Sequence, residues 1–177
     1  DIKGLEGNYW CAADDGKGHL LVGKNTNGLS VVDLKTRQCK NFMHVPNDPN
    51  SLPGNCVKSI FIDNTGNIWV GTSNGLAQFN LEEGTFTVFR HNPENKYSLI
   101  SNQVNDIGQD KEGKIWICTY MGGASILDLH ANSFTRPEDT HFKNITFTGN
   151  KHGLSSPNAR CFMQDCFGNI WLGNYRG

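Results

Sequence analysis

One short pattern occurs four times in this 177-residue chain: an Asp, two residues, a Gly, one residue, and an apolar strand that usually ends in Gly. The copies read DGKGHLLVG at 15–23, DNTGNIWVGT at 63–72, DKEGKIWICT at 110–119 and DCFGNIWLG at 165–173. The glycine that lies three residues after the Asp (Gly18, Gly66, Gly113 and Gly168) recurs at intervals of 47 to 55 residues. A recurring period of this length indicates an array of similar supersecondary units.

The second copy predicts how one unit folds. Apolar residues alternate from Cys56 to Ile62, and further short strands are expected at 68–72, 76–80 and 85–89. The segments between them are rich in Gly, Asn and Asp, which favour tight turns. No long apolar stripe with helical spacing occurs. The sequence therefore predicts an all-β fold of β-propeller blades, each with four antiparallel strands.

The same template divides the whole chain. It predicts blades at 8–43, 56–90 and 103–148 and an incomplete blade at 158–177, so that 1–177 is part of one β-propeller domain, a partial propeller of three and a half blades. The third unit is longer because 129–144 replaces a short turn, and we expect this insertion on the surface. Since the last blade lacks two strands, we also expect the segment not to close on itself and to leave apolar blade faces exposed.

The repeated polar and aromatic residues are interpreted as structural. An Asp that opens a turn three residues before Gly is expected to accept hydrogen bonds from the amides of that turn rather than to act in catalysis. The tryptophan of the second strand is replaced by Leu21 in the first unit, which indicates core packing between blades. The residues concerned are Asp63, Asp110 and Asp165, and Trp69, Trp116 and Trp171.

No catalytic, metal or cofactor motif is found. The six histidines lack ligand spacing, and no nucleophile motif or phosphate loop occurs. The six cysteines show no metal spacing, and we expect small buried strand residues rather than disulfides. With a formal net charge of −1, the chain gives no electrostatic reason to expect nucleic acid binding. We therefore predict that this segment is not an enzyme, and we expect a binding function.

The second unit resembles a known repeat. Residues 55–76 (NCVKSIFIDNTGNIWVGTSNGL) are similar to the two-component regulator propeller repeat, and the resemblance extends over nearly the whole chain. Two residues separate Asp from Gly, unlike the single residue of sialidase Asp boxes, and the Trp-Asp ending of WD40 blades is absent. Departures from the repeat are Leu21 for Trp, Cys118 for Gly, and 122–124 for the usual Gly-Leu.

The resemblance implies a role. Propellers of this family form the periplasmic sensor region of hybrid two-component histidine kinases, which are inner-membrane proteins that regulate transcription. It implies that the segment senses an oligosaccharide, contacts the remainder of the propeller and sensor chain, and acts within a homodimer, while the kinase and DNA-binding parts lie elsewhere. Two alternatives remain: a propeller enzyme acting on glycans, as a lyase or hydrolase, and a protein-interaction scaffold.

The connectivity of a four-stranded blade predicts where a ligand binds. The loops from the second to the third strand, and from the fourth strand to the next blade, emerge on the face opposite the Asp-x-x-Gly turns. We expect this face to carry the variable residues and hence recognition. Tyrosine offers an apolar ring with a polar tip, while Asn and Arg direct hydrogen bonds. The candidate ligand-binding residues are Asn25, Asn74, Tyr120, Asn174, Tyr175 and Arg176.

Overall fold

The computed structural model describes residues 2–130, 137–146 and 154–174. The first two groups of strands are β1 (Tyr9–Asp14), β2 (His19–Lys24), β3 (Leu29–Asp33) and β4 (Cys39–Phe42), then β5 (Val57–Ile62), β6 (Ile68–Thr72), β7 (Gly75–Asn80) and β8 (Thr85–Phe89). The others are β9 (Val104–Gln109), β10 (Ile115–Thr119), β11 (Gly123–Leu127), β12 (Phe142–Ile145), β13 (Ala159–Gln164) and β14 (Ile170–Asn174). A 3-10 helix, η1 (Pro137–Asp139), precedes β12.

The strands form antiparallel sheets in sequence order. Strands β1–β4, β5–β8 and β9–β12 make three four-stranded sheets, and β13 pairs with β14. We call these sheets blades one to four. The predicted fold class, all-β with blades of four antiparallel strands, is confirmed.

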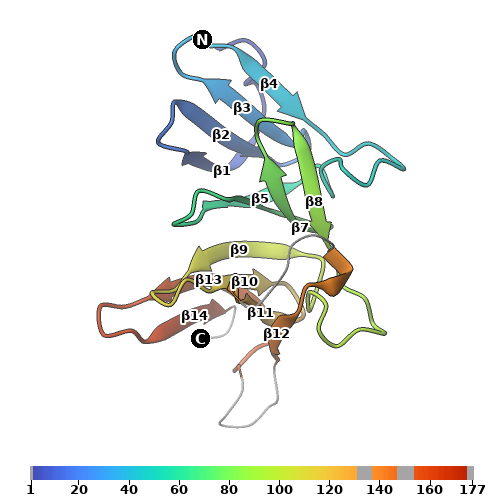
Figure 1. The fold of residues 1–177 in the computed structure, drawn as a ribbon, viewed down its shortest axis with the longest axis vertical. Helices are drawn as coiled ribbons and strands as arrows, with labels where there is room; N and C mark the ends of the chain where they lie inside the picture. The colour runs from blue at the N-terminus through green and yellow to red at the C-terminus, as the bar shows by residue number, and fades with distance from the viewer. Residues whose placement is uncertain (1, 131–136, 147–153, 175–177) are drawn as a thin grey trace.

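The blades lie side by side like the leaves of a fan (Figure 1). The first strand of each blade contacts the first strand of the next, so that β1, β5, β9 and β13 form the inner edge. The fourth strands β4, β8 and β12 lie toward the outside (Figure 1). Residues on the first strands therefore come close together across blades, although they are far apart in the sequence.

Two faces follow from this connectivity. The turns β1–β2, β5–β6, β9–β10 and β13–β14, each with an Asp-x-x-Gly pattern, point to the left in Figure 1, and we call this side the turn face. The connections β4–β5 and β8–β9 extend to the right. The loops β2–β3, β6–β7 and β10–β11 emerge at the same ends of the strands as these connections, and we call this side the loop face.

Apolar side chains fill the interfaces between blades. Phe42 of blade one contacts Phe79 and Phe86 of blade two, with ring centroids 4.9 and 5.9 Å apart. Between blades two and three, Trp69 joins a buried cluster with Val104 and other residues of blade three. The core is thus a series of interblade layers, and each layer needs two sheets.

At one position in these layers, a larger side chain in one blade is balanced by a smaller side chain in the next blade. A Cβ atom on Gly71 would lie 2.6 Å from a methyl carbon of Val104, so the glycine makes room for the valine of the next blade. In blade three Cys118 replaces this glycine, and the first residue of β13 is Ala159 instead of valine. Cys118 and Ala159 are both fully buried and pack in one cluster. The sequence departure at Cys118 is therefore balanced by a smaller residue in the neighbouring blade.

In blades two, three and four the Asp-x-x-Gly turn also holds the tryptophan of the second strand. Oδ1 of Asp63 accepts hydrogen bonds from the amides of Thr65 and Asn67, both at 2.9 Å, which confirms the predicted turn-forming role. Oδ2 of Asp63 accepts a further bond from Nε1 of Trp69 at 2.9 Å. The same indole bond recurs from Trp116 to Asp110 at 2.7 Å and from Trp171 to Asp165 at 3.0 Å.

Blade one replaces this bond. The side chain of Leu21 has no N–H group, and Oδ2 of Asp15 instead lies 2.7 Å from Nδ1 of His19. Amides of Lys17 and His19 still donate to Oδ1 of Asp15. The turn therefore persists without the tryptophan.

The surroundings of the three tryptophans differ. Trp69 is fully buried and Trp116 is 9% exposed, because the next blade covers each of them. Trp171 is 58% exposed, since no described blade lies on that side of β14. The prediction that all three indoles pack between blades is correct for the first two and wrong for Trp171 in this chain.

Two further sequence predictions need correction. Part of the insertion is not on the surface: Thr140 is buried, and the amide of Phe142 donates to the carbonyl of Tyr97 in the preceding connection. Residues 131–136 of the insertion, and 147–148 at the predicted end of blade three, lie outside the described residues. All six cysteines are free thiols, but only Cys118 is buried, and Cys161 and Cys166 are exposed.

Candidate functional site

The side chains of the three predicted ligand-binding asparagines form hydrogen bonds with other residues at the loop face. Oδ1 of Asn25 accepts from Nε1 of Trp10 at 2.9 Å. Nδ2 of Asn74 donates to the carbonyl of Pro53 at 3.0 Å, and Nδ2 of Asn174 donates to Oγ of Ser155 at 2.7 Å. These amides fix loops and neighbouring side chains, so their contribution to a ligand site is first of all to shape it.

Tyr120 combines a fixed backbone with an exposed side chain. Its amide donates to the carbonyl of Gln103 at 2.9 Å, and its own carbonyl accepts from Oγ of Ser101 at 2.9 Å. The residue is 40% exposed, and the neighbouring Met121 is 65% exposed. An exposed aromatic ring on a fixed backbone is suited to ligand contact because little conformational entropy of the main chain is lost on binding. Tyr175 and Arg176 lie outside the described residues.

The connections that bound the loop face are repeated rather than variable. In β4–β5 the amide of His44 donates to Oδ1 of Asn55 at 2.7 Å, and in β8–β9 the amide of His91 donates to Oδ1 of Asn102 at 2.7 Å. The ring of each histidine also bonds to the carbonyl of a buried leucine, Leu52 or Leu99. The expectation that this face gathers variable residues is therefore wrong for these two connections, which are part of the scaffold.

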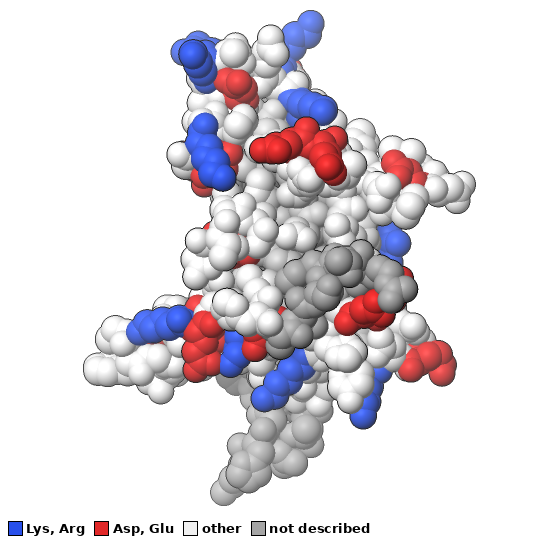
Figure 2. All heavy atoms as spheres, viewed as in Figure 1, with Lys and Arg blue, Asp and Glu red and all other residues white. Residues whose placement is uncertain are grey.

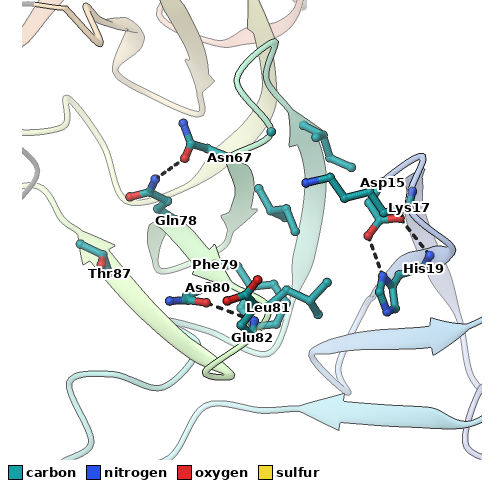
Figure 3. Close-up of a pocket in the computed structure, with 13 residues that line it drawn as sticks. Asp15, Lys17, His19, Asn67, Gln78, Phe79, Asn80, Leu81, Glu82 and Thr87 are labelled. Carbon is teal, nitrogen blue, oxygen red and sulfur yellow. Dashed lines mark hydrogen bonds and ion pairs between the residues drawn. The ribbon is translucent and has the colours of Figure 1, made fainter.

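The turn face carries a cleft that the sequence did not predict. It has a volume of about 630 Å³ and lies between the β1–β2 turn and the sheet of blade two (Figure 3). The Asp15–His19 pair stands on one side, and Gln78, which donates to Asn67, stands on the other (Figure 3). The cleft mixes polar groups with the apolar side chains of Ile62, Ile68, Phe79 and Leu81.

Two carboxylates at the turns, Asp63 and Asp15, are held as anions. Burial would raise the pKa of Asp63, but hydrogen bonds from Trp69, Thr65 and Asn67 outweigh it, and the pKa lies below its usual value. Burial likewise opposes the lowered pKa of Asp15, and bonds from the turn amides and from His19 prevail. A carboxylate held in its charged form by several donors is a poor general acid, which favours the structural interpretation of these residues.

The described residues give little support for catalysis. Burial raises the pKa of the Cys11 thiol to about 11, and it raises that of Cys118 further, so neither is a thiolate nucleophile at neutral pH. Within 2–130, 137–146 and 154–174, no group of three His, Cys, Asp or Glu side chains could hold a metal ion. No helix in the same ranges is long and apolar enough to cross a membrane.

Charges of both signs are dispersed over the surface in view. Lysine and arginine side chains are scattered among aspartate and glutamate, and no extended patch of one sign covers the described atoms of this side (Figure 2). A broad electrostatic surface for nucleic acid is therefore not visible there. On this side, groups that could recognise a charged ligand are local.

Two of the repeats match a known family in sequence, and nearly the whole chain is similar to known structures in fold. Residues 51–74 and 98–121 match the family model of the two component regulator propeller. The chain is 36% identical, over 94% of its length, to the extracellular domain of a hybrid two component system from B. thetaiotaomicron, with a TM-score of 0.73. A second such extracellular domain from the same organism is 21% identical over 99% of the chain, with a TM-score of 0.77.

The chain covers only 19% and 23% of these two structures, so it spans about a fifth of their length. Virginiamycin B lyase from Staphylococcus aureus shares the fold, with 12% identity, a TM-score of 0.52, and coverage of 98% of this chain and 66% of that one. At that identity the likeness concerns the fold alone. No curated protein matches the sequence.

Proposed function

We propose that this chain, whose repeats are those of the two component regulator propeller family, is a non-catalytic, ligand-sensing segment of the periplasmic region of a hybrid two-component histidine kinase. The observation that carries the proposal is the 36% identity, over nearly the whole chain, to the extracellular domain of such a system. Enzymatic phosphotransfer then belongs to other parts of the protein. The segment supplies a rigid scaffold on which a ligand is recognised.

The ligand in this proposal is an oligosaccharide that binds on the loop face. Tyr120 supplies an exposed ring for the apolar side of a sugar, and the amides of Asn25, Asn74 and Asn174 shape the surrounding loops. Tyr175 and Arg176 continue the chain after β14 and complete the proposed set.

The proposal includes partners and location. The segment contacts the remainder of the propeller and sensor chain, because the indole of Trp171 offers an apolar surface of the kind that neighbouring blades cover elsewhere. The intact protein is a homodimer in the inner membrane, with this segment in the periplasm, and a bound ligand changes the geometry of the dimer. The segment itself contacts no nucleic acid.

Titration calorimetry on the intact protein tests the ligand site. After a screen of oligosaccharides identifies a ligand, Tyr120→Ala should weaken its binding at least tenfold while the melting temperature stays nearly unchanged, because the ring is exposed. Arg176→Ala is expected to weaken binding as well. Phe167→Ala provides the matched control, since Phe167 is 88% exposed on the turn face and should not affect affinity.

Each other outcome contradicts a defined part of the proposal. Unchanged affinity in Tyr120→Ala, together with a loss when turn-face residues are changed, would place the site in the cleft of blades one and two. Turnover of a glycan by the purified protein would favour the enzyme alternative. Binding of a protein but of no oligosaccharide would favour an interaction scaffold.

A further inference from the structure

A β-bulge recurs at the same position in all four blades. In β1, Tyr9 pairs with Lys24 and Cys11 pairs with Gly23, which leaves Trp10 as an extra residue opposite two neighbouring residues of β2. The pairing of the other first strands shifts in the same way, one step from the beginning of each strand. The extra residues are Trp10, Lys58, Asn105 and Arg160.

The bulges place these four side chains along the inner edge of the fan. A bulge leaves its extra residue out of the ladder and changes the direction of its side chain. Nζ of Lys58 lies 3.4 Å from Oδ1 of Asn105, and Nδ2 of Asn105 donates to the carbonyl of Ala159 at 2.9 Å. The extra residues of blades two and three therefore reach toward the next blade. Because each bulge is near the start of its strand, the set lies at the loop face.

The identity of the extra residue changes from blade to blade, although the bulge does not. The scaffold positions repeat: Asp opens every turn, and Trp follows in three of four blades. At the bulge the residue is an indole, an ammonium, an amide and a guanidinium in turn. A fixed backbone that presents four different polar or aromatic side chains is the arrangement expected of a recognition site rather than of a packing position.

We propose that this set, the bulge ring of Trp10, Lys58, Asn105 and Arg160, binds the acidic group of an oligosaccharide at the inner edge of the loop face. The inference rests on the proposed sensing function and names its ligand class: sugars that carry a carboxylate or a sulfate. Arg160 and Lys58 flank Asn105 and can pair with an anion, and the guanidinium plane suits bidentate contact with its oxygens. Trp10, 60% exposed and held by Asn25, offers its ring to the apolar face of the sugar.

One carboxylate near the bulge ring would repel a bound anion. Asp106 follows Asn105 on β9, and its oxygens bond to Oγ of Ser59 at 3.4 Å and to the amide of Phe162 at 3.0 Å. Both bonds join neighbouring blades, so Asp106 connects the first strands. The two cations at the bulges, Lys58 and Arg160, exceed this single negative charge, and Arg160 is exposed.

The test uses the intact protein that contains this segment. An array of neutral, uronate-bearing and sulfated oligosaccharides is probed first, and each ligand found is then titrated beside its neutral counterpart, the methyl ester or the desulfated form. We expect acidic ligands only, with affinity that falls on neutralisation and at high ionic strength. Lys58→Gln and Arg160→Gln should each weaken binding at least tenfold. Lys17→Gln makes the same charge change on the turn face and should leave affinity unchanged.

The outcomes separate this inference from the proposed function. If the protein bound only neutral oligosaccharides, the bulge ring would not be an anion site, while the sensing function would stand. The same conclusion would follow if Lys58→Gln and Arg160→Gln both left the affinity for an acidic oligosaccharide unchanged. A loss caused by Lys17→Gln alone would move the site to the turn-face cleft. Failure to bind any oligosaccharide would overturn the sensing of sugars, and the bulge ring with it. The melting temperature of each variant distinguishes lost contacts from lost folding.

Discussion

Blades two and four contain the same local unit in different surroundings. In both, an aspartate accepts bonds from the amides of its turn and from the indole of the tryptophan six residues later. Trp69 is fully buried because blade three covers it, whereas Trp171 is 58% exposed. The aspartate–tryptophan unit therefore forms from local sequence alone, and burial of the indole depends on a second sheet. Substitutions in these units separate the local contribution from the contribution of interblade packing.

The largest expected effect is the loss of a buried indole. Trp69→Ala should lower the free energy of unfolding by about 3–5 kcal/mol, because it removes a fully buried ring from an interblade cluster. Trp171→Ala in the same 177-residue chain should cost less than about 2 kcal/mol, since most of that ring is in contact with solvent. Denaturant unfolding of both variants measures the difference. Equal losses would show that Trp171 is covered in solution.

A smaller effect is expected at the aspartate. Asp63→Ala should cost about 2–3 kcal/mol, because the buried indole N–H of Trp69 loses its acceptor together with the turn amides. The control is Asp15→Ala in blade one, where the side chain of Leu21 has no N–H and the partner is the partly exposed His19; about 1 kcal/mol is expected there. If the two variants were equally destabilised, the indole bond would contribute nothing beyond the turn.

Cys118 in blade three is larger than the glycine found in blade two, and Ala159 in blade four is smaller than the valine found in blade three. This exchange of side-chain volume predicts that substitutions at Cys118 and Ala159 are energetically coupled. Cys118→Gly and Ala159→Val should each cost about 1–3 kcal/mol, the first by opening a cavity and the second by overpacking. Together they recreate the Gly71–Val104 pair of blades two and three, so the double variant should recover about 1 kcal/mol or more relative to the sum of the single losses. Strictly additive losses from a thermodynamic cycle would contradict the compensation.

The smallest effect concerns the charge of an exposed carboxylate. The bonds from Trp171 and Asn169 lower the pKa of Asp165 to about 2. A lowered carboxylate pKa stabilises the folded state above the unfolded pKa of about 4, and this contribution is lost as the pH falls through about 2. Trp171→Phe removes the first of these donors and should move the pKa toward its usual value. Carboxyl titration by NMR measures the shift, and an unchanged pKa would mean that the indole bond does not form in solution.

Much of the fold could be predicted because its signals are local. Turn residues such as Asp63 and Gly66 specify the chain reversals, and alternating apolar residues specify the strands, so the all-β class and the four-stranded blades follow from the repeat. The hydrogen bond from the indole of Trp69 to Asp63 was not predicted. The fixed spacing of six residues between Asp and Trp in three repeats could have indicated it. The structured β4–β5 and β8–β9 connections were also missed, and the recurrence of His, Ser, Leu and Asn in both was the available signal.

The candidate site was predictable only in part. Antiparallel connectivity alone places Asn25, Asn74 and Tyr120 on one face. Which of them remains exposed depends on contacts between distant residues: Asn74 bonds to Pro53, whereas the ring of Tyr120 is open to solvent. The cleft on the turn face arises between two blades, and no pattern within one repeat describes it.

The repeat, the strand order within each blade and the face on which each loop emerges follow from the linear sequence, because these depend on turns and alternation over a few residues. How the blades pack against one another follows only from the folded arrangement. The pairing of Cys118 with Ala159, the burial of Trp69 and the alignment of four bulges along the inner edge each join residues from different repeats. Such contacts depend on the volume and direction of side chains across an interface, which a linear pattern does not encode.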